Sequence, residues 1–442
     1  MRAMPKARSP AQLTRRLPRQ LVVLLRQLGR MADEAGIRLY LVGGVVRDLL
    51  LKRETWDLDL SVEGDGIAFA RLVADRYGAG LAVFDRFATA RLTFFNGLKV
   101  DIASTRSESY VKPAALPNVR PATLQEDLYR RDFTINAMGL QLNAEKFGQL
   151  HDPYSGQRDL KAKLIRVLHA GSFIDDPTRI FRAIRFVERF GFALELKTRQ
   201  LLRRAAATNM IASLSGPRLA NEIFLLMQER DPSRAIESLR RWNLLRFLHP
   251  QLRDGKQVKS LIRSLPRALA WWKLQCPGQR VNPGLLYLMT IVSSAGSSIR
   301  HAIARRLQLS TKETTALEWA GDSTGRAAKI LLRRRDMQPS EIYRLLLNMP
   351  DEAVALVLAK GLTSRKNRER VRRLTKRLLR FMKHDRSMTT IVNGEDLKQL
   401  GLKPGPHFKT ILERLLDERL DGRITGVAQE RDRARTLVER YG

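Results

Sequence analysis

Residues 39–48 read LYLVGGVVRD, a run of apolar residues followed by two glycines. The apolar residues predict a buried strand, and Gly43-Gly44 predicts a tight turn that opens a helix from Val45 to Leu51. Backbone N–H groups at such a turn can hold a phosphate, and the positive end of the helix dipole adds to the attraction. Arg47 lies in the first helical turn, within reach of a phosphate oxygen. We therefore interpret the stretch as a candidate phosphate-binding turn, with a purely structural turn as the alternative.

An acidic pair follows in the sequence WDLDL at residues 56–60. On a strand, residues i and i+2 point to the same face, so Asp57 and Asp59 project together while the neighbouring leucines face a core. Two adjacent carboxylates repel each other unless a hard cation lies between them, and oxygen ligands suit Mg²⁺. The alternative is a pair on an exposed edge strand that water solvates.

A further acid, Asp101, lies in the apolar sequence VDIA at residues 100–103. Beside Asp57 and Asp59 it would complete a two-metal site, in which one metal lowers the pKa of an attacking hydroxyl and the other stabilises the leaving oxygen. Asp101 is also a candidate base for the hydroxyl proton. The alternative is an ordinary acid at the end of a strand.

Strand and helix patterns mix from residue 38 to about residue 149, and helical patterns dominate after Lys161. We predict strands at Thr55–Val62, Leu81–Asp85, Thr89–Phe95 and Leu98–Ala103, a helix at Gly66–Tyr77 and a loop at Val111–Thr123. The later helices are expected to break near Gly216-Pro217, Pro250, Pro266, Pro277, Pro283, Pro339 and Pro350. This pattern predicts an α+β protein, in which a mixed head precedes all-helical domains.

The composition points to a polyanionic partner. The 442 residues include 80 Lys and Arg against 45 Asp and Glu, a formal charge of +35, which favours nucleic acid unless the whole proteome is basic. The single cysteine, Cys276, excludes an internal disulfide and a cysteine-based zinc site. No apolar stretch approaches the ~20 residues of a membrane helix, and we expect a cytoplasmic protein. The basic N-terminal residues lead into an expected amphipathic helix from Pro18 to Ala35, with a transit peptide as the alternative.

Four motifs occur in a familiar order and spacing. They are LVGGVVRD at 41–48, DLD at 57–59, RRDFTINAM at 130–138 and DDPTRIFRAIRF at 175–186. Together they resemble the motifs of class II tRNA nucleotidyltransferases (CCA-adding enzymes) and bacterial poly(A) polymerases. The resemblance is strong over residues 38–250, and a weaker one at residues 391–406 is to the C-terminal part of the tRNA enzymes. Asp175 departs from the family pattern, which has Glu at this position.

The resemblance implies a small mixed-sheet nucleotidyltransferase head followed by a helical neck, body and tail. Its expected parts are a basic N-terminal extension at 1–37, the catalytic head at 38–160, the neck at 161–250, the body at 251–384 and the tail at 385–442. Asp57 and Asp59 would bind the metals, with Mg²⁺ as the cofactor, and Asp176 and Arg179 would read the base edge without a template. The other residues that it assigns to the nucleotide are Gly43, Gly44, Arg47, Arg131, Arg182 and Arg185.

The arginines after residue 175 can also be interpreted without the resemblance. Arg179, Arg182 and Arg185 are three apart, so they share one face of a helix that Asp176 is placed to cap. Arg179 offers donors and Asp176 offers acceptors, which are the two functions needed to distinguish a base. The alternatives are a solvated arginine face and an Asp176 that only caps.

A basic run at residues 365–383 holds ten Lys or Arg against one acid, Glu369. Such clusters neutralise phosphates without reading sequence, and a solvated helix face is the alternative. The residues that we expect to bind RNA are Arg365, Lys366, Arg368, Arg372, Arg373, Lys376 and Arg377.

The activity implied by the resemblance is template-independent addition of C and/or A to the 3′ end of tRNA from CTP and ATP. The RNA 3′-hydroxyl would attack the α-phosphate in line and release pyrophosphate. One alternative is a poly(A) polymerase that adds AMP to RNA 3′ ends. Another is a catalytically idle RNA-binding protein, which the intact Asp57, Asp59 and Arg131 argue against.

Overall fold

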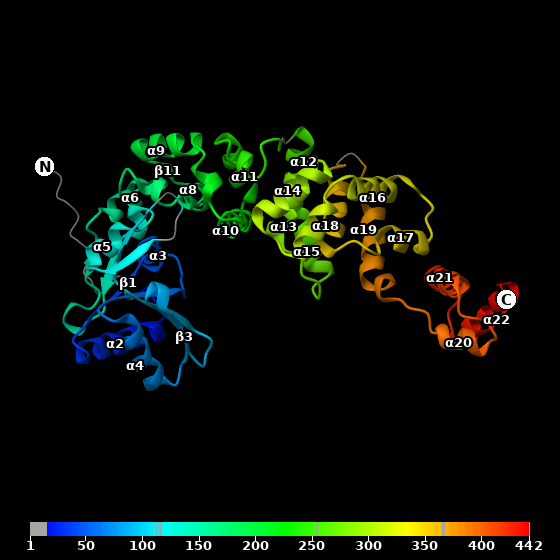
Figure 1. The fold of residues 1–442 in the computed structure, drawn as a ribbon, viewed down its shortest axis with the longest axis horizontal. Helices are drawn as coiled ribbons and strands as arrows, with labels where there is room; N and C mark the ends of the chain where they lie inside the picture. Colours follow the sequence, from blue (N-terminus) through cyan, green and yellow to red (C-terminus); the bar gives the residue numbers. More distant parts are fainter. Residues whose placement is uncertain (1–15, 112–113, 115–116, 253–254, 365–366, 442) are drawn as a thin grey trace. The chain divides into compact units, whose positions relative to one another are not determined.

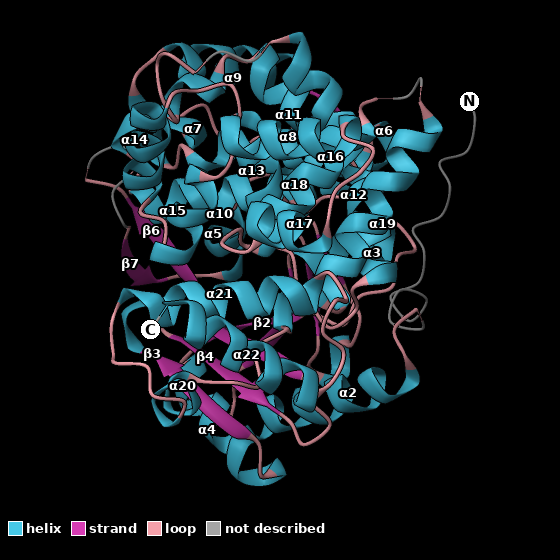
Figure 2. Cartoon of the chain, turned by 90° about the vertical axis from the view of Figure 1, so that its right-hand side faces the viewer, coloured by secondary structure: helices cyan, strands magenta, loops and turns pink. Residues whose placement is uncertain are grey.

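The computed structural model describes residues 16–111, 114, 117–252, 255–364 and 367–441. The chain divides into two compact units (Figure 1). Unit 1 comprises Met1–Glu222 and Glu229–Leu244, and unit 2 comprises Ile223–Gln228 and Leu245–Gly442. All the strands assigned in the described residues lie in unit 1, and helices make up most of the remainder (Figure 2). The mixed head and helical remainder confirm the predicted α+β class, while the finer division into five parts stays a prediction.

A seven-stranded mixed sheet forms the centre of unit 1, in the order β3-β4-β5-β2-β1-β8-β9. Its strands are β1 Arg38–Val42, β2 Leu58–Glu63, β3 Gly80–Phe84, β4 Thr89–Thr93, β5 Lys99–Ser104, β8 Gly139–Gln141 and β9 Leu150–His151. β2 runs parallel to β5, whereas β1 pairs antiparallel with both β2 and β8. The register places Asp59 of β2 directly beside Asp101 of β5. This pairing brings two of the predicted acids to neighbouring positions in the sheet.

The central strands of the sheet show the alternation of apolar and polar residues that is visible in the sequence. Val100 and Ile102 of β5 are fully buried, and helix α4 (Gly66–Tyr77) packs on β4 and β5. Asp101 lies between these two apolar residues and therefore points to the opposite face. Asp65 caps α4 through its side chain, and Gly78 ends the helix in the left-handed conformation. The predicted bounds of this helix are confirmed.

The amphipathic helix predicted from Pro18 to Ala35 is present as α2 (Arg19–Glu34), and it packs against β1 of the sheet. Leu21, Leu25 and Leu28 form its buried face. A Cβ atom at Gly29 would lie 1.9 Å from the carbonyl oxygen of Leu142, so only glycine permits this approach.

The loop predicted at Val111–Thr123 is in part wrong. Strand β7 (Asn118–Pro121) lies inside it and pairs antiparallel with β6 (Arg106–Ser109) as a separate two-stranded sheet. Pro121 is accommodated because it is the last residue of a strand with only one partner. Proline spacing alone therefore concealed a strand.

The rest of unit 1 is mainly helical. Its elements are α3 Gly44–Leu50, α5 Leu124–Tyr129, α6 Gly156–Ala162, the parallel pair β10 Leu164–Ile165 and β11 Ala193–Leu194, α7 Ser172–Asp175, α8 Thr178–Phe190, α9 Leu196–Ala207, α10 Gly216–Met227, whose last residues belong to unit 2, and α11 Pro232–Arg241. Short 3₁₀ turns occur at η1 Asp85–Phe87, η2 Thr134–Asn136, η3 Ala144–Lys146 and η4 Met210–Ser213.

Unit 2 is helical throughout its described residues. Its elements are η5 Leu244–Phe247, which begins at the last residue of unit 1, α12 Lys256–Gln275, α13 Pro283–Ile291, α14 Ser297–Leu307, α15 Thr311–Glu318, α16 Asp322–Arg333, α17 Pro339–Leu346, α18 Asp351–Leu362, α19 Arg368–Lys383, η6 Asp385–Ser387, α20 Gly394–Gln399, α21 Pro406–Leu420 and α22 Val427–Tyr441. In the part of the chain that the structure describes, no helix is long and apolar enough to cross a membrane.

The helix break predicted near Pro266 is wrong, because α12 continues through this residue. Ile262, Leu265 and Ala268 on both sides of the proline are buried, and α12 packs against α18. Burial of this apolar face outweighs the one hydrogen bond that proline removes. Pro283 and Pro339 instead begin their helices, where the missing N–H costs nothing.

Candidate active site

A cavity of about 390 Å³ opens in unit 1 at the sheet end where β1 ends and β2 begins. It brings together eight residues singled out from the sequence, which are Gly43, Gly44, Arg47, Asp59, Arg131, Asp176, Arg179 and Arg182. Six further lining residues were assigned no role from the sequence, although four of them lie within the quoted motifs; they are Glu108, Tyr110, Arg130, Asp132, Asn136 and Phe186. Asp57, Asp101 and Arg185 lie outside its lining.

The glycine turn holds two functional side chains close to the backbone. Gly43 has a φ of +80°, which favours glycine, and α3 begins at Gly44. A Cβ atom at Gly43 would lie 2.7 Å from Nη1 of Arg131 and 3.9 Å from Oδ2 of Asp59. The guanidinium therefore occupies the space that a larger residue at position 43 would fill. The turn and the cation suit a phosphate, and the carboxylate beside them suits a cation that the phosphate could share.

Asp59 carries the perturbed carboxyl of the site. Burial raises the pKa of Asp59 to about 6, the negative charge of Asp57 adds to the rise, and the Arg131 guanidinium opposes it. Asp57 is exposed and lies just before β2, whereas Asp59 is the second residue of β2. The acidic pair therefore lies at the beginning of this strand. A half-buried carboxylate that a neighbouring carboxylate repels is stabilised by a bound cation, and both groups offer the oxygen donors that a hard divalent ion prefers.

Asp101 is adjacent to this pair but already has a partner. Its two carboxylate oxygens accept hydrogen bonds from Nε and Nη2 of Arg91, each at 2.7 Å. Within the described ranges, no group of three or more His, Cys, Asp or Glu side chains is arranged to hold a metal ion. The structure thus brings Asp101 beside Asp59 without making it part of a three-carboxylate cluster.

Arg47 and Arg131 line the cavity from two elements. Arg47 is buried in α3, where its Nη1 donates to Oδ1 of Asn136 at 2.6 Å and its Nη2 pairs with Asp48. Nη2 of Arg131 binds Asp127 at 3.0 Å, and Nε of Arg131 has no hydrogen-bond partner although it is buried. Both cations are thus fixed by a partner on one side while they face the cavity on the other.

Helix α8 contributes the arginines expected from the fourth motif. The guanidinium of Arg179 donates to Oγ of Ser172 and to the carbonyl of Arg130, both at 2.6 Å. Arg182 forms two hydrogen bonds with Asp132, at 2.9 and 2.6 Å. Arg185 does not reach the cavity, because its guanidinium turns to Glu222 at 3.5 Å. Of the three arginines predicted to share one face of the helix, Arg179 and Arg182 therefore line the cavity and Arg185 does not.

Asp176 acts at the start of α8 and also reaches a neighbouring helix. Its Oδ1 accepts from the backbone N–H of Thr178 at 3.0 Å and from Nη2 of Arg218 at 2.8 Å. Asp176 is not the cap residue itself, because Pro177 occupies the cap position of α8 without a side-chain hydrogen bond, and Asp176 accepts from the first helical N–H from one residue further back. Arg218 of α10 holds the carboxylate at the cavity wall.

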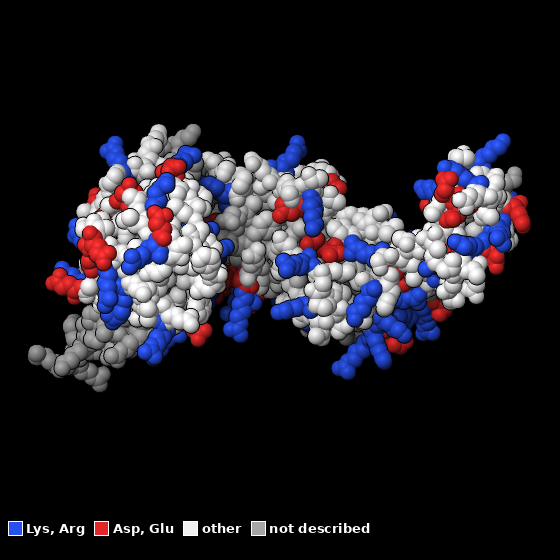
Figure 3. All heavy atoms as spheres, turned by 90° about the horizontal axis from the view of Figure 1, so that it is seen from below, with Lys and Arg blue, Asp and Glu red and all other residues white. Residues whose placement is uncertain are grey.

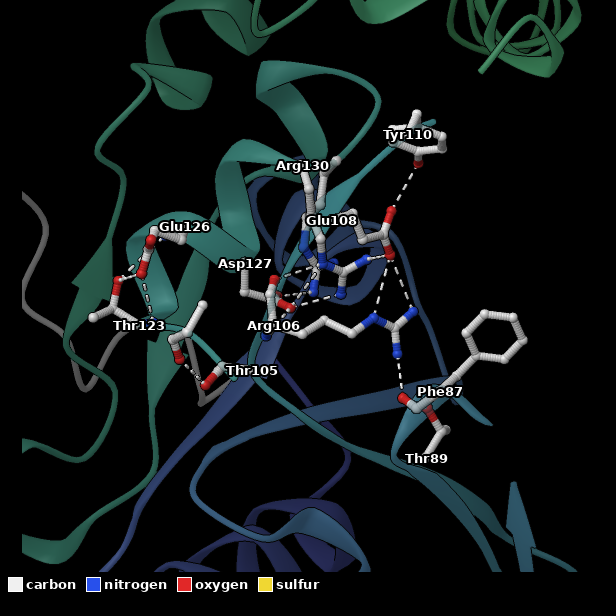
Figure 4. Close-up of polar contacts among 12 residues, drawn as sticks. Phe87, Thr89, Thr105, Arg106, Glu108, Tyr110, Thr123, Glu126, Asp127 and Arg130 are labelled. Atoms are coloured by element: carbon white, nitrogen blue, oxygen red, sulfur yellow. Dashed lines mark hydrogen bonds and ion pairs between the residues drawn. The ribbon is translucent and has the colours of Figure 1, made fainter. Parts of the chain in front are cut away.

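A network that the sequence interpretation missed forms another wall of the cavity (Figure 4). One oxygen of Glu108 accepts from Arg106 and Arg130, and the other accepts from the Tyr110 hydroxyl at 2.8 Å. Asp127 is fully buried and binds Arg130 at 2.6 Å. Burial and the charge of Glu108 raise the pKa of Tyr110, so its hydroxyl stays a donor. The sequence did contain a signal for this network: Arg106, Glu108 and Tyr110 are two residues apart, which on a strand places their side chains on the same face.

Comparison with known proteins identifies the family of this chain. Residues 39–166 match the family described as Poly A polymerase head domain, and residues 191–255 match the one described as Probable RNA and SrmB- binding site of polymerase A. The A-adding tRNA nucleotidyltransferase of Halalkalibacterium halodurans is 34% identical over 405 residues, which cover 91% of this chain and 89% of that protein. The chain belongs to the tRNA nucleotidyltransferase and poly(A) polymerase family.

Two further family members are longer proteins. The A-adding tRNA nucleotidyltransferase of Geobacter sulfurreducens is 40% identical over 418 residues, which cover 93% of this chain and 46% of that protein. The A-adding enzyme of Aquifex aeolicus is 42% identical over 258 residues, which cover 58% of this chain and 31% of that protein. The chain thus spans less than half the length of these two relatives.

Solved structures of the family match over nearly the whole chain. A CCA-adding enzyme in apo form II has a TM-score of 0.82 at 32% identity and covers 96% of this chain and 98% of its own. The Thermotoga maritima CCA-adding enzyme complexed with tRNA has a TM-score of 0.75 at 29% identity, with 98% and 99% covered. Similar CCA-adding enzymes were solved with CTP and with ATP.

From Arg368 on, the basic run expected to bind RNA lies on α19 of unit 2, and Figure 3 shows Lys and Arg side chains gathered on parts of the molecular surface. Three of the expected residues are exposed at four-residue spacing, which are Arg368, Arg372 and Lys376. Arg373 pairs with Glu369 at 3.4 Å. Arg377 instead donates to the backbone carbonyls of Leu331, Arg334 and Arg335 at 2.7–2.9 Å, at the end of α16. Arg365 and Lys366 lie outside the described residues.

Proposed function

We propose that this chain adds C and/or A nucleotides to the 3′ end of tRNA without a template, using CTP and ATP and releasing pyrophosphate. One observation carries the proposal: a single cavity joins a glycine turn, the half-buried carboxylate of Asp59 and the start of an arginine-bearing helix. The turn suits a triphosphate, the carboxylate suits a metal ion, and the helix start offers donors and acceptors for a base. Those are the three parts of a nucleoside triphosphate complex.

The triphosphate would lie across Gly43 and Gly44. Backbone N–H groups at the start of α3 would donate to it. Nη1 of Arg131 lies beside the turn, 2.7 Å from where a Cβ atom at Gly43 would be. Arg182 adds positive charge from α8, held in place by Asp132. These groups hold the nucleotide in one orientation, so that its α-phosphate faces Asp59. Positioning and charge stabilisation supply most of the catalysis in phosphoryl transfer.

Asp57 and Asp59 would hold the divalent metal, and Mg²⁺ is the ion that their oxygen donors suit. The bound metal would activate the attacking hydroxyl and stabilise the leaving oxygen, which is its role in two-metal transfer. In the reaction, the RNA 3′-oxygen forms a bond to the α-phosphorus while the bond to the β-phosphate oxygen breaks. Asp101 has both oxygens on Arg91, so a role as the base requires Arg91 to release it.

Base choice would rest on Asp176 and Arg179. Their fixed partners, Arg218 for the carboxylate and Ser172 for the guanidinium, hold both side chains at the cavity wall. A rigid donor and acceptor pair penalises a base whose edge does not match, because buried polar groups are then left unpaired. This arrangement supports selection of C and A by the protein itself.

The tRNA acceptor is supported by the family members. Relatives that match most of the chain are named A-adding, CC-adding and CCA-adding enzymes, and one solved relative is complexed with tRNA. Addition of the terminal A is the narrower form that the A-adding relatives favour. A poly(A) polymerase remains the alternative because the head match carries that description.

The test gives the purified protein two acceptors, a tRNA transcript shortened at its CCA end and an unstructured RNA of equal length. Each nucleotide is supplied singly with Mg²⁺, and the products are resolved by length. We expect one or a few C or A residues on the tRNA and little extension of the unstructured RNA. Long A tails on both acceptors would establish the poly(A) alternative, and no extension of either would overturn the proposal.

A further inference from the structure

Two adjoining cavities open in unit 2. The larger has a volume of about 540 Å³ and the smaller about 350 Å³, and they share Arg267, Leu362 and Ser364. Their walls come from α12, the end of α18 and α19, and α18 packs against both of the other helices. Both volumes lie within the roughly 300–1,000 Å³ of small-molecule sites. The four nucleotide motifs lie in unit 1, so they do not account for these cavities.

Two walls of the cavities each carry a pair of exposed arginines. The pairs are Arg263 and Arg267 on α12, and Arg368 and Arg372 on α19. Residues four apart share one face of a helix, so both members of each pair can reach the same ligand. Among the described residues, none of the four guanidinium groups has an ion-pair or hydrogen-bond partner, and no Asp or Glu lines either cavity. Like charges gathered without a counter-charge repel one another, and a bound anion removes that repulsion.

Hydroxyl groups add further donors to the lining. Ser260 lies three residues before Arg263 on α12, and Ser364 lies just beyond the end of α18. Neither hydroxyl has a hydrogen-bond partner within the described ranges. Guanidinium groups bind phosphate oxygens in pairs, and hydroxyls can donate to the oxygens that remain. The lining therefore suits a phosphate group and contains no carboxylate that would repel it.

The position of the two arginine pairs favours a compact ligand over an RNA duplex. Arg368 and Arg372 belong to the exposed face of α19, which the phosphates on the outside of a duplex can reach. Arg263 and Arg267 line the cavity from α12, and a duplex is too broad to enter a space of this size. A chain of two or three linked phosphates is small enough to enter. It carries several negative charges on few atoms, which matches arginines on two walls.

We propose that these cavities form a binding site for a compact polyphosphate, either the free ion or the triphosphate of a nucleotide. The arginine pairs of α12 and α19 hold it from two walls, and the hydroxyls of Ser260 and Ser364 donate to it. The α19 pair also belongs to the face that we expect to bind tRNA, so the polyphosphate competes with tRNA there. This competition rests on the proposed function, whereas the site itself does not.

The first test counts bound ions by equilibrium dialysis with labelled inorganic triphosphate in the presence of a metal chelator. The double variant Arg263→Ala/Arg267→Ala, called the α12 variant, removes one pair and leaves α19 intact. The control Lys329→Ala/Arg333→Ala removes the same charge from α16, where both residues are exposed and line neither cavity. Circular dichroism melting checks the fold of each. At saturation, the parent and the control should each bind one more triphosphate per chain than the α12 variant.

The second test measures tRNA affinity with inorganic triphosphate or with sodium chloride at equal ionic strength. In the parent, triphosphate should weaken tRNA binding beyond the effect of chloride. It should also make the slope of log affinity against log salt shallower by about two, because two arginines of α19 are then occupied. The α12 variant should bind tRNA as the control does and should respond to triphosphate only as it responds to chloride. Dialysis with ATP in place of inorganic triphosphate shows which of the two sources the site accepts.

Equal triphosphate binding by the parent and the α12 variant would overturn the site. A loss of tRNA affinity in the α12 variant beyond that of the control would overturn it too, because the cavity would then hold the RNA backbone. Triphosphate that binds without weakening tRNA binding would overturn the competition. If the parent binds no tRNA, the proposed function fails, and the dialysis still decides whether the polyphosphate site exists.

Discussion

Asp59 is the side chain on which the chemistry depends most, because it is half-buried and is repelled by Asp57. We expect Asp59→Asn to lower turnover by at least about 100-fold, since even outer partners of a metal cost 10–100-fold. The replacement keeps the shape and removes the charge, so the fold and the affinity for tRNA should persist. The measurement is incorporation at saturating Mg²⁺ together with filter binding of tRNA.

A matched control for this change lies in the same unit. Asp65→Asn makes the same chemical change at the cap of α4, where Asn caps about as well as Asp. It should leave turnover and tRNA binding as in the parent. Near-normal turnover in Asp59→Asn would remove the metal role from this carboxylate.

The proposed roles of Arg179 and Asp176 in base choice can be tested by measuring how the protein discriminates among the four nucleotides. Arg179→Ala should relax discrimination among the four nucleotides by roughly 1–3 kcal/mol, the cost of one unpaired buried polar group. Asp176→Asn should also change the ratios of kcat/KM, although Asn can still accept from the N–H of Thr178. Equal slowing with all four nucleotides would instead assign Arg179 a structural role, in keeping with its hydrogen bonds to Ser172 and Arg130.

Lys360 makes a prediction about pH. Burial lowers the pKa of Lys360 to about 8 in the folded protein, from an ordinary value near 10.5. Between these values the unfolded chain binds more protons than the folded one, so the free energy of unfolding should rise with pH in this window, by up to about 1.4 kcal/mol per pH unit. Below pH 8 the cost of burying the charge is fully present. Lys360→Met should remove this rise, which denaturant titrations between pH 7.5 and 10 would measure.

The control for the pH measurement is Lys329→Met on α16, because Lys329 is exposed. Its pH dependence should match that of the parent. The difference between parent and Lys360→Met cancels every other titrating group. An equal pH dependence in the two proteins would show that Lys360 titrates as an ordinary lysine.

The sequence revealed the residues with special chemistry and missed those that hold them. Gly43, Asp59 and Arg179 stand out because glycine turns, paired acids and arginine-bearing helices have local signatures. Glu108 has no such signature, and Asn136 lies in the motif at 130–138 without a role that the motif reveals. Glu108 acts by binding Arg130 and Asn136 by binding Arg47, both from distant parts of the chain. Arg185 was expected at the nucleotide, and only packing beside Glu222 reveals where it turns.

At the scale of elements, α19 separates two kinds of basic residue. Arg368, Arg372 and Lys376 are exposed. Replacing all three by Ala should weaken tRNA binding and make it less dependent on salt. The slope of log affinity against log salt should become shallower by as much as about three, because up to three fewer phosphates are neutralised. Arg377→Ala should instead lower the melting temperature, because its guanidinium binds carbonyls at the end of α16. Equal slopes for the triple variant and the parent would show that this face meets only solvent.

Elements were predictable where a local signal decided them. The cap at Asp65 and the left-handed Gly78 fix both ends of α4. By contrast, β7 was hidden because Pro121 within it and Pro117 just before it suggested a loop, and its pairing with β6 is set by contacts that spacing cannot show. The course of α12 through Pro266 depends on burial against α18, which is again a tertiary effect.

At the scale of the whole molecule, the formal charge of +35 and the family membership agree on a polyanionic partner. The nucleotide cavity belongs entirely to unit 1, while the exposed basic face of α19 belongs to unit 2. Chemistry and the electrostatic contribution to tRNA affinity should therefore be separable by mutation. Changes in unit 1 should alter turnover and selectivity, and changes on α19 should alter affinity and its salt dependence.

The most direct test of the account supplies all four nucleotides together to a tRNA shortened at its CCA end and sequences the 3′ ends that result. A site that reads the base with its own side chains should add only C or A and stop after one to three residues, and the Asp59→Asn protein should add none. Mixed sequences containing U and G, or long homopolymer tails, would contradict the account of protein-read base choice at the tRNA end.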